Sequence, residues 1–93
     1  NNGTLGMVRQ WQTLFFGHRY SQTTLDRGPD FMKLAAAYGL SGARVNAVET
    51  FAAAFKAAVE KREPCIIECM LDNDEMVAPM VAPGSPIDSF CLN

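Results

Sequence analysis

The residues best suited to chemistry stand in the first 16 positions of the chain. Two carboxamides, Asn1 and Asn2, open the sequence and are followed by Gly3. A carboxamide oxygen can serve as a ligand for a metal ion. Asn-Asn-Gly is also common turn chemistry. From these residues alone, a turn is the first interpretation, because a single carboxamide pair is a weak metal signal.

A helix is predicted directly after this turn, from Met7 to the glycine at position 17. Its apolar positions follow the spacing i, i+3, i+4 and i+7 of an amphipathic helix: Met7, Val8, Trp11, Leu14 and Phe15. Gly17 is the expected stop. The opposite face would carry Arg9, Gln10, Gln12 and Thr13. Periodicity alone assigns Met7, Trp11 and Phe15 to a core.

The other candidate groups have simpler explanations. His18 is the single histidine, but it follows a glycine in a polar stretch and is interpreted as a surface residue. Cys65 and Cys69 lack the second pair of ligands that a zinc site needs. The acidic run at 72–75 is interpreted as a solvated turn. Arg9 could pair with a phosphate or serve a structural role, and the residues leave both open.

Composition limits the classes of function. The chain has 93 residues, 48% of them hydrophobic and 19% charged, with a net charge of −2. These values fit one small folded domain. The charge pattern contains no basic patch for nucleic acid, and no apolar run is long enough to span a membrane. Three cysteines suggest buried thiols in a reducing cytoplasm. The absence of an initiating methionine suggests a piece of a longer protein.

Two further helices and two strands are expected. A helix should begin at Pro29, with Asp30 in its first turn, and end at Gly39. A strand is expected at 41–45. Asn46 and Glu49 could form a capping box for a third helix. The buried face of that helix would consist of Val48, Phe51, Ala52, Phe55 and Val59.

The run at 65–71 is the most strand-like stretch and is apolar on both faces, which favours a parallel sheet covered by helices. The fold class is therefore α/β: a partial doubly wound parallel sheet, with helices around roughly two strands. Residues 76–93, which contain three prolines, should form an extended tail with a short turn near 87–90. A sheet of two strands is marginal alone, so the chain should associate with copies of itself or lack a partner.

The sequence resembles the thiamine-diphosphate domain of the acetolactate synthase (acetohydroxyacid synthase) catalytic subunit. The resemblance rests on Asn1-Asn2 followed by Leu5-Gly6-Met7-Val8-Arg9-Gln10-Trp11-Gln12. Four further motifs follow in the order and spacing of that family: Arg19-Tyr20-Ser21, Pro29-Asp30-Phe31, Ala37-Tyr38-Gly39 and Pro79-Met80-Val81. The likeness covers essentially all of residues 1–93 and corresponds to the C-terminal part of the domain.

The resemblance implies roles for individual residues. The family's metal motif is Gly-Asp-Gly followed far downstream by Asn-Asn, and only the second half is present. By position, Asn2 would give Mg²⁺ a side-chain oxygen and Thr4 a backbone carbonyl. Cofactor contacts would come from Leu5, Gly6 and Met7, where the amides that begin a helix favour an anion. Met7, Val8, Trp11 and Phe15 would line the channel for the second 2-ketoacid.

The resemblance also implies a reaction and its partners. The parent enzyme would be a transferase that uses thiamine diphosphate and Mg²⁺ to join pyruvate to a second 2-ketoacid (pyruvate or 2-ketobutyrate), in the synthesis of valine, leucine and isoleucine. FAD would be bound outside this chain. The catalytic subunit would form a homodimer or larger oligomer with a regulatory small subunit, in the cytoplasm, without nucleic acid or membrane.

No catalytic residue is expected within the chain, so the chain alone should be inactive. Two alternatives stay open at this point. One is another thiamine-diphosphate-dependent decarboxylase or carboligase, and the other is a non-catalytic assembly module.

Overall fold

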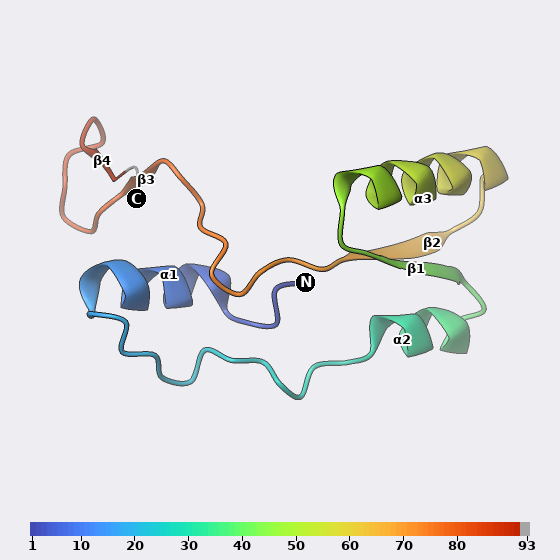
Figure 1. The fold of residues 1–93 in the computed structure, drawn as a ribbon, viewed down its shortest axis with the longest axis horizontal. Coiled ribbons are helices and arrows are strands. Elements are labelled where there is room, and N and C mark those ends of the chain that lie inside the picture. The colour runs from blue at the N-terminus through green and yellow to red at the C-terminus, as the bar shows by residue number, and fades with distance from the viewer. Residues whose placement is uncertain (92–93) are drawn as a thin grey trace. The chain divides into compact units, whose positions relative to one another are not determined.

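The structure is a computed structural model, and it describes residues 1–91. The elements along the chain are α1 (Gly6–Phe15), α2 (Phe31–Ala37), β1 (Ser41–Val45), α3 (Val48–Lys61), β2 (Cys65–Cys69), β3 (Met80–Val81) and β4 (Phe90–Cys91) (Figure 1). The chain divides into two compact units. The first unit is Asn1–Asn2 with Asp26–Leu71, and the second unit is Gly3–Leu25 with Asp72–Asn93.

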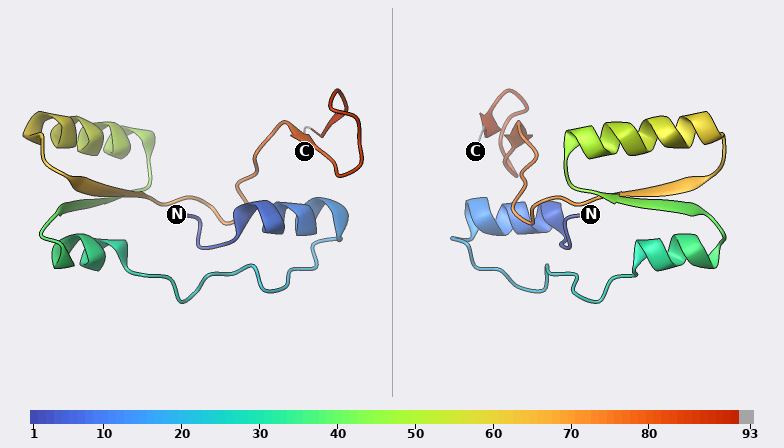
Figure 2. Two further views of the ribbon diagram at one scale, coloured as in Figure 1. Left: turned by 180° about the vertical axis from the view of Figure 1, so that it is seen from behind. Right: turned by 45° about the vertical axis from the view of Figure 1, so that its right-hand side comes forward.

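The first unit contains a parallel pair of strands between two helices. β1 pairs with β2 in parallel, with Ser41 opposite Cys65 and Val45 opposite Cys69. Helices α2 and α3 lie on opposite sides of the pair in all three ribbon views (Figures 1 and 2). Helix cover on both sides explains why β2 is apolar on both faces. The predicted α/β class with a partial parallel sheet is confirmed.

Helix α2 begins at Phe31, two residues after the predicted start at Pro29. Asp30 is the N-cap, and its carboxylate accepts hydrogen bonds from the backbone N–H groups of Met32 (3.0 Å) and Lys33 (3.2 Å). Pro29 therefore lies outside the helix. Asp30 takes the cap position because its carboxylate can accept hydrogen bonds from the first free N–H groups of the helix, which a proline side chain cannot do. Gly39, with φ of +68°, ends the helix as predicted.

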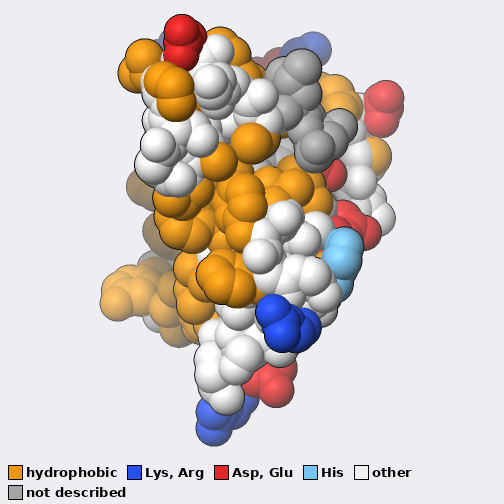
Figure 3. Space-filling view, turned by 90° about the vertical axis from the view of Figure 1, so that its left-hand side faces the viewer, with side chains coloured by type: hydrophobic (Ala, Val, Ile, Leu, Met, Phe, Trp, Pro, Cys, Tyr) orange, Lys and Arg blue, Asp and Glu red, His pale blue; other side chains and the backbone are white. Residues whose placement is uncertain are grey.

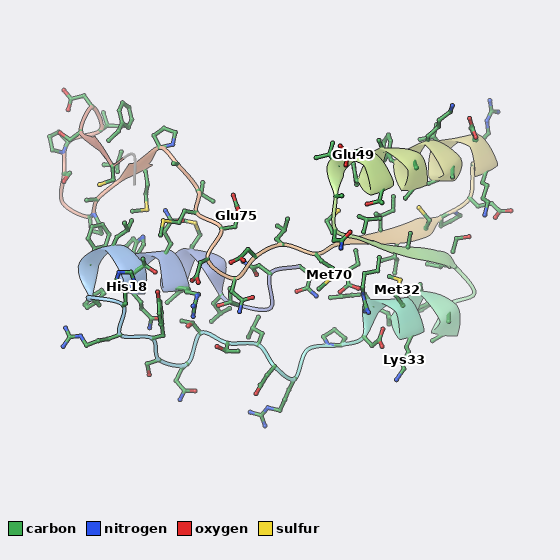
Figure 4. All side chains as sticks on the ribbon, in the orientation of Figure 1. His18, Met32, Lys33, Glu49, Met70 and Glu75 are labelled. Atoms are coloured by element: carbon green, nitrogen blue, oxygen red, sulfur yellow. The ribbon has the colours of Figure 1, made fainter. Side chains whose placement is uncertain are left out.

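Close packing joins α2 to β1. A Cβ atom at Gly42 would lie 3.2 Å from Ala35 Cβ and 3.2 Å from Met32 Sδ. Ala35 is only 1% exposed. Figure 4 shows the side chain of the neighbouring Lys33 directed away from the sheet. The absence of a side chain at Gly42 thus allows the helix to approach the strand.

The capping interaction of α3 does not use the residues that the sequence predicted, so that prediction is wrong. The N-cap is Ala47, and the Thr50 hydroxyl accepts a hydrogen bond from the Ala47 N–H at 3.2 Å. Asn46 and Glu49 do not form the cap. The helix starts one residue later than expected because Thr50 reaches back to the residue three positions before it, the spacing that a capping interaction requires.

The face of α3 that the sequence assigned to the core is largely exposed, although Val48 and Phe51 also line a cleft with Val45 and Cys69 at the end of the strands. Four large apolar residues are 40–79% exposed: Val48, Phe51, Phe55 and Val59. Small side chains face β1 and β2 instead, where Ala54, Ala57 and Ala58 line a cleft of about 140 Å³. The rings of Phe51 and Phe55 stack at a centroid distance of 5.8 Å. Helix α3 therefore presents alanines to the sheet, and its phenylalanine face, formed by Val48, Phe51, Phe55 and Val59, is largely exposed.

The second unit packs α1 against residues of the tail. Gln10 is 5% exposed and is held at both ends: its Nε2 donates to the Val77 carbonyl (2.9 Å), and its Oε1 accepts from the Val77 N–H (2.8 Å). The tail also contains an antiparallel pair, with Met80 opposite Cys91 and Val81 opposite Phe90. The sequence predicted the turn that precedes Phe90 but not this pair of strands. Thr4 and Thr24 form one isolated antiparallel bridge.

Large apolar side chains remain exposed over much of the described chain. The buried hydrophobic residues are Ala35 and Val45. Figure 3 shows a broad apolar area on the face that also presents the single histidine. The three cysteines are free and partly exposed, so the expectation of buried thiols is wrong. Within residues 1–91, no helix is long and apolar enough to cross a membrane.

The Gln10 contacts give a test of the second unit. We expect Gln10→Ala to cost about 1–3 kcal/mol locally, because Val77 loses both hydrogen-bond partners in a buried setting. Hydrogen exchange of the Val77 amide should become about tenfold faster for each 1.4 kcal/mol by which the local stability falls. The matched control is Gln12→Ala, since Gln12 donates to the Ser21 carbonyl instead. Equal Val77 exchange in wild type and Gln10→Ala would contradict this assignment.

Candidate functional site

The Asn-Asn pair begins at the carboxyl end of β2. The Asn1 N–H donates to the Cys69 carbonyl, and the Leu71 N–H donates to the Asn1 carbonyl at 3.0 Å. The Asn1 carboxamide donates to Glu68 Oε1 at 2.8 Å. Ligands of open α/β sheets bind at the carboxyl ends of the strands. The position of Asn1 is therefore one where a ligand site is expected in this fold class.

The residues after Asn1 form a turn, as the sequence predicted. Asn2 belongs to the first unit, and Thr4 belongs to the second unit. Gly3 between them has φ of +63°, a left-handed conformation that glycine adopts without steric cost. The Thr4 hydroxyl donates to the Thr23 carbonyl at 2.7 Å, and Thr4 is 7% exposed. The Thr4 side chain is thus occupied by a contact within its own unit.

The start of α1 provides backbone N–H groups without a side-chain cap. Leu5 is the N-cap residue, no side chain caps it, and the first turn contains no acidic residue. The Leu5 N–H donates to the Thr23 carbonyl at 2.8 Å. The following positions, Gly6 and Met7, begin the helix itself. An uncapped helix start without acids is suited to an anion.

The four predicted channel residues share one exposed face of α1. Met7, Val8, Trp11 and Phe15 lie within an arc of about 100° on an ideal helix. Their exposed fractions are 40–51%. Trp11 and Phe15 form an edge-to-face pair at 6.2 Å. The assignment of Met7, Trp11 and Phe15 to a core is wrong, because the buried face of α1 is instead the one that carries Gln10.

Arg9 takes a structural role in this arrangement. Its Nε lies 2.6 Å from Asp74 Oδ1, and its guanidinium lies 3.9 Å from the centre of the Tyr20 ring. The hydrogen bond from Arg9 lowers the pKa of Asp74 below its ordinary value. The Tyr20 hydroxyl also contacts Thr13 (3.0 Å) and His18 (3.1 Å). Asp74 is therefore an ion-pair partner and not simply part of a solvated acidic turn.

Glu68 is the acidic residue that sequence reasoning missed. Its side chain is 5% exposed and accepts from Arg44 Nε at 2.6 Å, while Arg44 Nη2 lies 3.6 Å from Asp30. Hydrogen bonds from Asn1 and then from Arg44 hold the pKa of Glu68 below its ordinary value. The sequence did contain a signal for it, because Glu68 is a charged residue within an otherwise apolar strand. In the structure, the parallel register sets Glu68 opposite Arg44.

Other metal-binding chemistry is not assembled in the described chain. Within residues 1–91, no three His, Cys, Asp or Glu side chains form a group that could hold a metal ion. His18 is exposed, as predicted for a surface residue. The metal donors that the family resemblance predicts, the side-chain oxygen of Asn2 and the backbone carbonyl of Thr4, are neutral oxygens and do not belong to these residue types.

Comparison with known families defines the class of protein. Residues 1–69 match the family described as thiamine pyrophosphate enzyme, C-terminal TPP binding domain. This match covers both strands of the parallel sheet and the Asn-Asn turn. The chain therefore belongs to this family of thiamine-diphosphate-binding domains.

The individual relatives narrow the comparison to acetolactate synthases. The chain is 48% identical over 90 residues to the mitochondrial acetolactate synthase catalytic subunit of Saccharomyces cerevisiae, covering 97% of this chain and 13% of that protein. It is 42% identical over 85 residues to the large subunit of acetolactate synthase isozyme 2 of Escherichia coli, covering 91% and 16%. The large subunit from Pyropia yezoensis is 41% identical, with coverage of 90% and 14%.

These relatives confirm the family resemblance and its extent. The chain spans 13–16% of the length of these three proteins. The comparisons do not address the roles of single residues, so the metal, cofactor and channel assignments stay predictions.

The charge of Glu68 predicts a dependence of stability on pH. Because the pKa of Glu68 is lowered by folding, its stabilising contribution is present above the unfolded-state pKa of about 4.3 and is lost as the pH falls through the folded value. The free energy of unfolding of wild type should exceed that of Glu68→Gln near neutral pH. This difference should shrink below about pH 4. Urea titrations at several pH values measure it.

The control for this titration is Glu60→Gln on α3, where Glu60 is 65% exposed and lies 3.9 Å from Lys56. We expect only a small, nearly constant difference from wild type. A Glu68→Gln difference that does not vary with pH would contradict the assigned ion pair.

Proposed function

We propose that the chain forms part of an acetolactate synthase, the thiamine-diphosphate- and Mg²⁺-dependent transferase that condenses pyruvate with a second 2-ketoacid in branched-chain amino acid synthesis. The observation that carries this proposal is the exposed face of Met7, Val8, Trp11 and Phe15 on the helix that directly follows the Asn-Asn turn. Membership of the thiamine-diphosphate-binding family and similarity to three acetolactate synthases support it.

In this proposal, Asn2 and Thr4 hold Mg²⁺ with two neutral oxygens. The donor set suits the ion, because Mg²⁺ prefers oxygen and usually shares phosphate oxygens and water. The contact between the Thr4 hydroxyl and Thr23 supports a ligand role for the Thr4 main chain only. Leu5, Gly6 and Met7 would contact the cofactor at the uncapped start of α1. When bound, thiamine diphosphate supplies the electron sink for decarboxylation and carbon–carbon bond formation.

The channel residues would act on the 2-ketoacids. Trp11 is large and rigid, and Phe15 supports it edge-on. Such a surface excludes water and sorts 2-ketoacids by the size of their side chains. Pyruvate and 2-ketobutyrate differ by one methylene group. A hydrophobic site can favour one of two such substrates over the other by about 1–3 kcal/mol of binding free energy in the transition state.

The remaining parts of the enzyme would lie outside this chain. These parts are the glutamate that activates the cofactor, the aspartate of the metal motif and the FAD site. A homodimer or larger oligomer of catalytic subunits, with a regulatory small subunit, is the proposed assembly. The cytoplasm stays the predicted compartment, although the yeast relative is named as mitochondrial.

A non-catalytic assembly module is the second candidate. The phenylalanine face of α3, with Phe55 54% and Val59 60% exposed, favours it because such a face is a common contact surface. Cofactor binding separates the two candidates.

The cofactor half-site can be tested by calorimetric titration with thiamine diphosphate and Mg²⁺. We expect measurable binding that Asn2→Ala abolishes or weakens at least about tenfold, as expected when an oxygen ligand is removed. The matched control is Asn46→Ala, an exposed asparagine of the first unit, which should bind like wild type. The absence of heat in wild type would favour the assembly module.

The isolated chain should not turn over pyruvate. By the family resemblance, the glutamate that activates the cofactor and the aspartate of the metal motif would lie outside the chain, so the groups that start the reaction would be missing. Acetolactate formation by 93-residue protein supplied with pyruvate, thiamine diphosphate and Mg²⁺ would contradict this prediction. The complete catalytic subunit serves as the positive control.

A further inference from the structure

Asn1 is held to β2 by its main chain. Its N–H donates to the Cys69 carbonyl, and its carbonyl accepts from the Leu71 N–H at 3.0 Å. These two bonds, to the residues on either side of Met70, are the pattern of a parallel strand pair. The Met70 N–H points the other way and donates to the Val45 carbonyl of β1 at 2.7 Å. Asn1 and β1 therefore lie on opposite edges of the chain at Met70. The main chain at Asn1 is thus fixed in direction.

The side chain of Asn1 is held by a second contact with the same strand. Its Nδ2 donates to Glu68 Oε1 at 2.8 Å, while Glu68 Oε2 accepts from Arg44 Nε at 2.6 Å. Both carboxylate oxygens are therefore engaged. Hydrogen bonds to an ionised acceptor are shorter and stronger than neutral ones, and the Glu68 side chain is only 5% exposed. The Glu68 carboxylate is thus largely shielded from water, while its partners Asn1 and Arg44 are exposed.

We infer that Glu68 is a positioning residue for the Asn-Asn turn, acting through Asn1 to orient the Asn2 carboxamide toward the cation. This inference rests on the proposed function, because it takes Asn2 as the metal ligand. The Asn1 bonds fix the chain immediately before Asn2. Groups that orient a metal ligand without touching the ion typically change metal affinity 10–100-fold when removed.

A merely structural role for Glu68 makes a different prediction. In that case the Arg44–Glu68 ion pair would serve only to join β1 to β2. Arg44→Met removes the ion pair and keeps the Asn1–Glu68 hydrogen bond. Glu68→Ala removes both. Glu68→Gln loses the charge but keeps an oxygen that can accept from Asn1. Comparison of these three variants separates positioning from strand pairing.

The test measures Mn²⁺ affinity by electron paramagnetic resonance, with thiamine diphosphate present, on the 93-residue chain. Mn²⁺ replaces Mg²⁺ as an oxygen-binding probe. We expect Glu68→Ala to weaken Mn²⁺ binding about 10–100-fold, Glu68→Gln to recover most of the affinity, and Arg44→Met to bind like wild type despite lower stability. Circular dichroism establishes that each variant is folded at the measuring temperature. Should Glu68→Ala fail to fold, Glu68→Gln and Asn1→Ala carry the comparison.

A second measurement needs no metal. The ¹⁵N order parameter of the Asn2 amide should be near the rigid value of about 0.85 in wild type and Arg44→Met, and clearly lower in Glu68→Ala. The inference is overturned if Glu68→Ala binds Mn²⁺ as tightly as wild type and keeps the wild-type order parameter at Asn2. It is also overturned if Glu68→Ala and Arg44→Met lose the same amount of Mn²⁺ affinity. Failure of the wild-type chain to bind Mn²⁺ overturns the cofactor half-site assigned under the proposed function instead. The order parameter of the Asn2 amide then still tests whether Glu68 positions the turn.

Discussion

A buried carboxylate near the carboxyl end of a short parallel sheet, that of Glu68, joins the parts of the first unit. Glu68 cannot remain ionised there without partners, and its two oxygens accept from Arg44 on β1 and from Asn1 at the carboxyl end of β2. One charge therefore joins both strands to the Asn-Asn turn. Asp30, the cap of α2, lies 3.6 Å from Arg44 and adds that helix to the same network.

Helices α1 and α3 have a second feature in common. Their small or polar side chains are packed inward, and their large apolar side chains are exposed. On α1, the buried residue is Gln10, whereas Trp11 and Phe15 are exposed. On α3, alanines face the sheet, whereas Phe55 is exposed. The outward face of α1 is the one that the proposed channel uses. This arrangement explains how a chain that is 48% hydrophobic buries few hydrophobic side chains.

The sequence predicted β1 and β2, their parallel pairing and the glycine that ends α2, because these follow from local residue preferences and from the apolar residues on both faces of β2. It did not predict β3 and β4. It did not predict which helix faces are buried. Periodicity identifies an apolar stripe on α3, but it cannot show whether the sheet contacts that stripe or the alanines beside it. Val77 lies 67 residues from Gln10, and Asn1 lies 67 residues from Glu68, beyond the reach of any local pattern. The family resemblance supplied the candidate site instead, through the motif that begins at Asn1.

The central claim is that the protein itself fixes the Asn-Asn turn to β2 before any cofactor binds. The most direct test is the hydrogen-exchange rate of the Leu71 amide in cofactor-free protein, because this N–H donates to the Asn1 carbonyl. The account predicts protection similar to that of the amides within β2. Exchange at the rate of an unfolded chain, with β2 itself protected, would contradict it.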